Sequence, residues 1–135
     1  MKRFFILSIL FVAVAFTQTS CGLGDAADKA EKNADKFHTY LKNKDTDGMM
    51  SMVHPEALAN EEEAWLELME KMSNELNVKK IEKSMGFNSS IQNGTATVTL
   101  NYVIHDENHG EVTEKIVLQD SDDGEMKIMG LHYNQ

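Results

Sequence analysis

Glu114, His132 and Tyr102 are the side chains of this sequence whose types could together carry out acid–base chemistry. A carboxyl group partly buried beside an imidazole or a phenol has a shifted pKa and can exchange a proton near neutral pH. The same groups can also form a structural ion pair at the wet mouth of a pocket. We therefore treat the three as ligand-pocket residues first and as catalytic candidates second.

These side chains meet only if the C-terminal half forms a sheet in one register. Apolar and polar residues alternate over residues 81–91, 95–104, 111–120 and 125–133, which predicts four strands. Asn93-Gly94 predicts a two-residue hairpin turn, and Asp122-Asp123-Gly124 a three-residue turn. Counting outward from the turns gives a row of pocket candidates on one sheet face: Met85, Tyr102, Glu114 and His132.

The last predicted strand has apolar side chains on both faces. Its inward set is Met126, Ile128, Gly130 and His132, which leaves Met129, Leu131 and Tyr133 pointing outward. An exposed apolar row of this kind predicts a homodimer or a partner surface at the C-terminal strand. The alternative is a strand covered on both faces by sheet and helix.

The N-terminal half predicts helices that pack on this sheet. Apolar residues at 27, 30, 34, 37 and 41 form one stripe of a helix, and residues 45–48 break it. A short helical turn follows and ends at His54-Pro55. A second long helix runs from Asn60 to about residue 77. Its apolar stripe includes Trp65, which we add to the pocket candidates.

Helices followed by an antiparallel meander predict an α+β fold with N-terminal helices packed on a curved, four-stranded, cone-like sheet. This order resembles the nuclear transport factor 2-like, or cystatin-like, cone fold. The resemblance covers roughly residues 26–133. It rests on the first helix, the break at residues 44–48, Trp65, the hairpin at Asn93-Gly94 and the closing strand from Gly124. It implies a concave pocket, but the family includes isomerases, dehydratases and binding modules, so it does not choose a function.

Cys21, the only cysteine, lies at the end of a segment built like an export signal. Lys2 and Arg3 precede an apolar stretch at residues 4–16, which is shorter than the ~20 residues of a membrane-spanning helix. Thr19-Ser20-Cys21 resembles the lipobox of bacterial lipoproteins, with Gln18 where an aliphatic residue is usual. We expect a signal peptide at 1–20, a lipidated tether at 21–25 and a single domain at 26–135. The alternative is an ordinary signal peptide followed by a chance cysteine.

Charge limits the partners. Removal of residues 1–20 takes away Lys2 and Arg3 and no acid, so the net charge changes from −9 to −11. Such a protein repels nucleic acid and anionic lipid headgroups, so lipid on Cys21 must provide the membrane contact. Gly22 after the cysteine favours the outer membrane of a Gram-negative bacterium. A small apolar ligand or another envelope protein is the expected partner.

Two polar loops contain ligand types that metals use. The loop at residues 105–109 has two histidines and two acids, and residues 120–125 are rich in aspartate, but neither has the spacing of a zinc or calcium site. The sequence also has no nucleophile elbow or glycine-rich phosphate loop. We expect no metal and no cofactor.

A non-enzymatic binding or interaction module in the cell envelope is the function that these observations favour. The alternative is a small isomerase, dehydratase or hydrolase that uses Glu114 with His132 or Tyr102. A third reading is a secretion-system or immunity-type lipoprotein.

Overall fold

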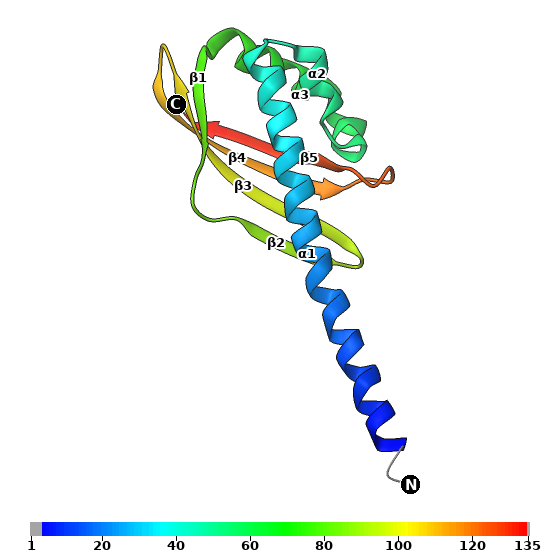
Figure 1. Ribbon diagram of the computed structural model, residues 1–135. Coiled ribbons are helices and arrows are strands. Elements are labelled where there is room, and N and C mark those ends of the chain that lie inside the picture. The colour runs from blue at the N-terminus through cyan, green and yellow to red at the C-terminus, as the bar shows by residue number, and fades with distance from the viewer. Residues whose placement is uncertain (1–3, 135) are drawn as a thin grey trace.

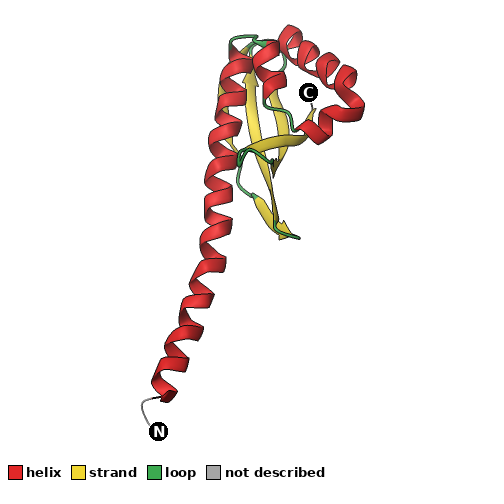
Figure 2. Cartoon of the chain, turned by 90° about the vertical axis from the view of Figure 1, so that its right-hand side faces the viewer, coloured by secondary structure: helices red, strands yellow, loops and turns green. Residues whose placement is uncertain are grey.

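The computed structural model describes the backbone of residues 4–134 and the side chains of residues 23–134. Three helices come first: α1 (Phe4–Lys42), α2 (Thr46–Ser51) and α3 (Pro55–Glu75). The strands are β1 (Val78–Lys83), β2 (Asn88–Gln92), β3 (Thr95–Asp106), β4 (Gly110–Asp120) and β5 (Met126–Asn134). The helices cover one side of a curved antiparallel sheet (Figures 1 and 2). The predicted α+β class is confirmed, with five strands in place of four.

The extra strand arises because the first predicted strand is interrupted. Both β1 and β2 pair with β3, and the residues between them include Gly86 at φ +100°, outside the extended region. Lys83 therefore lies opposite Tyr102, and the predicted pairing of Met85 with Tyr102 is wrong. Met85 lies in the connection with its side chain 98% exposed.

The register of the central strands agrees with the prediction. Tyr102 pairs with Glu114, and His105 pairs with Glu111. Asn93 and Gly94 both have positive φ, as a type I′ turn requires, and Ile91 pairs with Ala96. The strictly alternating burial of β3 leaves one register that buries its apolar face, so this part of the sheet could be read from the sequence.

The register of β5 changes at a β-bulge. Leu118 pairs with Ile128, but Val117 pairs with Gly130, so Met129 is an additional residue. Beyond the bulge Tyr133 lies opposite Glu114, and His132 lies opposite Lys115 on the outer face. The predicted row that joined Glu114 to His132 is therefore wrong. One inserted residue reverses the face of every side chain that follows it.

The same bulge removes the argument for an apolar outer face. Leu131 and Tyr133 are half-buried against the core rather than pointing outward. The first half of β5 is also covered at its edge, because Ile128 N donates to the Met52 carbonyl and His54 N donates to the Ile128 carbonyl. A homodimer through this strand stays a prediction, without the exposed row that suggested it.

Helix α1 is continuous through the residues expected to form a tether. Residues 21–25 are helical, and the domain boundaries at residues 20 and 25 stay predictions. The apolar stripe is confirmed from Ala30 on, with Ala30, Ala34, Phe37 and Leu41 all at 1% exposure or less. At its start Ala26 is buried, and the predicted Ala27 is only partly buried. No helix within residues 4–134 is long and apolar enough to cross a bilayer.

The ends of the shorter helices follow ordinary capping chemistry. Gly48 N donates to the Asp45 carboxylate at 2.9 Å, so Asp45 is the N-cap of α2. Helix α3 begins earlier than predicted, at Pro55, with His54 as its N-cap. Its backbone is non-helical at Glu61, so the predicted start at Asn60 corresponds to a kink inside one longer helix.

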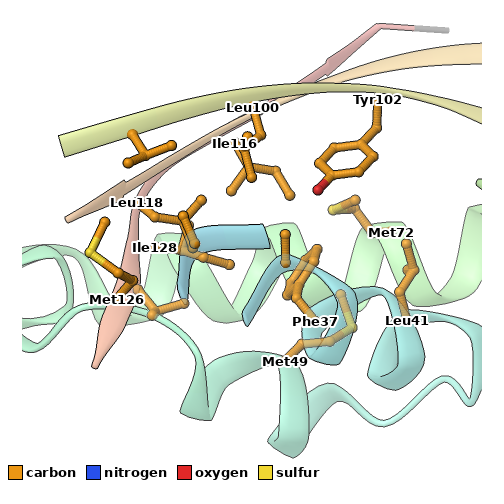
Figure 3. Close-up of a cluster of buried hydrophobic side chains, with 14 of the residues drawn as sticks. Phe37, Leu41, Met49, Met72, Leu100, Tyr102, Ile116, Leu118, Met126 and Ile128 are labelled. Carbon is orange, nitrogen blue, oxygen red and sulfur yellow. The ribbon is translucent and has the colours of Figure 1, made fainter. Parts of the chain in front are cut away.

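The core fills the space between the helices and the concave face of the sheet. Figure 3 shows Leu100, Tyr102 and Ile116 projecting from the sheet toward Phe37 and Met49. Met49, Met69 and Met72 are fully buried, as expected of flexible side chains that fill irregular gaps. The cone is therefore occupied by its own side chains.

Two glycines in helices provide a test of this packing. A Cβ on Gly48 would lie 2.7 Å from two ring carbons of Tyr40, whereas a Cβ on Gly24 would have nothing within 4 Å. We expect Gly48→Ala to destabilise the protein by about 1–3 kcal/mol, because the ring has to move. Gly24→Ala should be neutral or stabilising by up to ~1 kcal/mol. Urea unfolding of both variants checks this, and equal midpoints would contradict the close packing of α2 on Tyr40.

Candidate functional site

A buried imidazole–carboxylate pair forms the centre of the candidate site. His38 Nε2 lies 2.6 Å from Glu114 Oε1, and the two residues are 4% and 2% exposed. Helix α1 places His38 beside Phe37, on the face that packs against the sheet. Strand β4 turns Glu114 to the same side, because Glu114 alternates with the exposed Thr113 and Lys115. The pair therefore joins α1 to the centre of the sheet.

Two buried polar atoms, one of them in this pair, have no hydrogen-bond partner within the described part of the chain. They are Glu114 Oε2 and the hydroxyl of Tyr133, which lies opposite Glu114 in the sheet. Burial raises the pKa of Tyr133, and the charge of Glu75 raises it further. An unsatisfied buried polar atom costs about 1–3 kcal/mol, so the arrangement is expensive to maintain.

Tyr102 contacts the imidazole of the His38–Glu114 pair. Its ring meets the His38 ring edge-on, with centroids 4.5 Å apart and an interplanar angle of 82°. Burial raises the pKa of Tyr102 far above its usual range, and the carboxylates of Asp35, Glu31 and Glu114 raise it further. Tyr102 therefore stays protonated at physiological pH and acts as a neutral wall for the imidazole.

His38 and Tyr102 also border a groove between α1 and β1. The groove has a volume of about 480 Å³ and is lined by Glu31, Asp35, His38, Thr39, Lys42, Ile81, Lys83 and Tyr102. Lys83 forms an ion pair with Glu31 across it. Glu114 does not line this groove, so a molecule bound there would meet the imidazole while the carboxylate stays behind it.

The predicted pocket residues fall in two places. Met85, Tyr102, Glu114 and His132 border one recess of about 350 Å³ on the outer side of the sheet. The Tyr102 and Glu114 side chains are buried on the inner side, so they border this recess with their backbone. Trp65 is 8% exposed and belongs to the core under α3.

His38 is the site residue that the sequence interpretation missed. The sequence pattern gives His38 no part in the site and pairs Glu114 with His132 instead. The available signal was its spacing, since residues 34, 37, 38 and 41 share one helix face. That spacing puts His38 over the sheet but cannot say which strand residue it meets.

The two histidines at residues 105 and 109 each bond a carboxylate of the protein. His105 bonds Glu82 at 2.9 Å, and His109 bonds Asp106 at 2.7 Å. Desolvation raises the pKa of Asp106, but hydrogen bonds from His109, Asn77 and Asn108 outweigh it and hold the pKa below its usual range. Within the described residues, no three histidine, cysteine or acidic side chains are grouped to hold a metal ion.

Comparison with solved structures finds a shared architecture. A protein from Shewanella frigidimarina proposed to be a ketosteroid isomerase superposes with a TM-score of 0.57 at 18% identity, over 78% of this chain and 94% of that one. A proposed dehydratase of the nuclear transport factor 2-like family from Streptomyces avermitilis gives 0.54 at 16% identity, over 82% and 94%.

The fold is nuclear transport factor 2-like. The same architecture forms part of a larger protein, the helical cell shape determining protein Pgp2 of Campylobacter jejuni, with a TM-score of 0.52 at 14% identity over 74% of this chain and 38% of that one. No family model matches the sequence, and no curated protein matches it. At these identities the nuclear transport factor 2-like neighbours establish the fold alone.

The His38–Glu114 pair can be tested by a double-mutant cycle. We expect Glu114→Leu and His38→Leu each to cost about 3–5 kcal/mol of stability, because each leaves the other polar group buried without its partner. The double variant should cost less than the sum of the two, since an apolar pair leaves no orphaned group. Urea unfolding measures all four proteins. Strictly additive losses would contradict direct coupling between the two side chains.

Proposed function

We propose that this chain is an envelope lipoprotein whose nuclear transport factor 2-like domain is a non-enzymatic interaction module. Lipid on Cys21 anchors the domain, with the outer membrane of a Gram-negative bacterium as the expected location. The observation that carries the non-enzymatic part is the filled cone. Its floor is closed by the domain's own core and by the His38–Glu114 pair.

The filled cone argues against chemistry at Glu114. A general base must come within hydrogen-bond reach of the proton that it removes. The Glu114 side chain is 0% exposed and its Oε1 is occupied by His38, so a substrate in the α1–β1 groove would not touch it. In this arrangement the carboxylate orients His38 and joins two layers of the fold.

The lining of the groove indicates the kind of partner. Glu31, Asp35, Lys42 and Lys83 provide charges of both signs around the apolar surface of Ile81 and Tyr102. Such a surface suits a protein partner with polar and charged side chains better than a small apolar ligand. We therefore favour an envelope protein as the partner of the groove.

A second candidate function is supported by the imidazole at the groove. A histidine backed by a carboxylate is the arrangement that enzymes use to orient a general base. The Shewanella frigidimarina neighbour is proposed to be a ketosteroid isomerase, and the isomerisation of a ketosteroid requires proton transfer. In this alternative His38 would act with Glu114 behind it, and His132 would have no part.

An isomerase assay separates the two candidates. We expect the full chain to give no acceleration of the isomerisation of a β,γ-unsaturated 3-ketosteroid, because the core fills the space a steroid would need. The conversion is followed by ultraviolet absorbance of the conjugated product. An acceleration that Glu114→Gln and His38→Gln both abolish, while each variant keeps its folded circular dichroism spectrum, would overturn the non-enzymatic assignment.

The anchor is tested by replacing the cysteine. We expect the wild-type chain in the membrane fraction, with the mass of residues 21–135 plus lipid, because two or more acyl chains bind a bilayer stably. Cys21→Ser should accumulate as an uncleaved precursor or appear in the soluble fraction. Ser20→Ala, which keeps a small residue before the cysteine, is the control and should be processed normally. A Cys21→Ser chain that is cleaved and membrane-bound like wild type would refute the lipoprotein assignment.

A further inference from the structure

A stretch of the chain without charge includes the β2–β3 hairpin at one end of the domain. Residues 84–104 contain no Asp, Glu, Lys or Arg, in a protein in which 26% of residues are charged. The stretch includes the β1–β2 connection, β2 and most of β3. It exposes three of the large apolar side chains at the surface: Met85 at 98%, Phe87 at 56% and Ile91 at 47%. We call Met85, Phe87 and Ile91 the apolar patch.

The apolar patch lies on the side of the domain from which α1 extends. Figures 1 and 2 both show the β2–β3 hairpin at that end, with the N-terminal part of α1 continuing beyond it. Helix α1 contacts β2, and it is still buried at Ala26. Leu23, just under one helical turn further out, is a fourth exposed apolar side chain at 37%.

The helix sets a short distance between this end and Cys21. Residues 21–26 are helical, so Cys21 lies about 7.5 Å along the axis from Ala26, at 1.5 Å per residue. A flexible tether would let the domain turn freely, but a continuous helix transmits its direction. A lipid on Cys21 would therefore hold the β2–β3 end toward the bilayer.

We propose that the apolar patch is a second membrane contact, which rests on the bilayer surface beside the lipid anchor. This inference depends on the lipid anchor of the proposed function. Apolar side chains gain free energy at the interface between headgroups and acyl chains. The absence of charged residues from 84–104 also favours this contact, because the rest of a domain with net charge −11 is repelled by anionic lipid. The three patch residues add no negative charge of their own at this end, where Asp25 and Asp28 of α1 are also exposed.

A site-specific fluorescent label tests the proposal. Cys21 is the only cysteine, and a lipidated Cys21 has no free thiol, so an introduced cysteine can be labelled alone. The full lipidated chain carrying Ile91→Cys is labelled with an environment-sensitive dye. It is then placed in vesicles of phosphatidylethanolamine and phosphatidylglycerol that contain a lipid-borne quencher. Phe87→Cys serves as a second probe if Ile91→Cys does not fold.

The matched control is Asn108→Cys in the β3–β4 turn, which is exposed. It lies at the other end of β3, about 35 Å away at ~3.3 Å per residue. We expect the dye at residue 91 to shift to the blue and to be quenched about twofold or more relative to the dye at residue 108.

Every other outcome counts against the proposal. Equal quenching at residues 91 and 108 in a membrane-bound chain would overturn the second contact and leave the lipid anchor intact. A dye at residue 91 that is shielded from aqueous iodide but not quenched by the lipid would assign the apolar patch to contact with a second copy of the chain, since the vesicles contain no other protein. A wild-type chain without lipid mass and outside the membrane fraction would refute the anchor, and the second contact with it.

Discussion

The packing of helix α1 across the concave face of the sheet is the constraint on which the other features depend. Ala30 and Ala34 let the helix come close to the strands, and Phe37 fills the space beside them. Asn33 ties the same face to β5, since its side-chain amide donates to the Met126 carbonyl at 2.6 Å. Without this contact the sheet would have an uncovered apolar face, and the groove beside β1 would lack one wall.

The polar pair under α1 follows from that packing. A helix that covers a sheet so closely has little room for water, so His38 and Glu114 have to satisfy each other. Such pairs contribute little net stability compared with apolar residues of the same size, but they are costly to break. The pair therefore specifies the position of α1 on the sheet more than it stabilises the fold. Glu114 Oε2 and the Tyr133 hydroxyl are buried without a hydrogen-bond partner, so the polar groups here are only partly satisfied.

The fold and the proposed lipid anchor bear on function in different ways. The nuclear transport factor 2-like architecture supports both catalysis and binding in other proteins, so it leaves the choice to the site. Here the interior is filled, and the accessible surfaces include a charged groove along α1 and the apolar patch beside the N-terminal helix. A rigid helical connection to Cys21 would orient the groove and the apolar patch relative to a bilayer. The groove would then run along α1, in the direction that leads away from the bilayer.

Sequence patterns alone determined the α+β class, the helix stripe and the register of β3 with β4. In each case a strict period buries one face, and a shift by one residue would expose it. The two-residue turn at Asn93-Gly94 was readable for a related reason, because its backbone needs positive φ. The same patterns placed Glu114 and Tyr102 on the inner face, where the structure has them.

The tertiary structure decided the rest. Met129 forms a bulge while the first half of β5 is held between β4 and residues 52–54, and a local pattern carries no information about that. The bulge moved His132 to the outer face, and packing of α1 supplied His38 in its place. A helix stripe shows which side chains face the sheet, but only the position and tilt of the packed helix select the strand residue each one meets. The partner of Glu114 could therefore not be predicted from the sequence pattern.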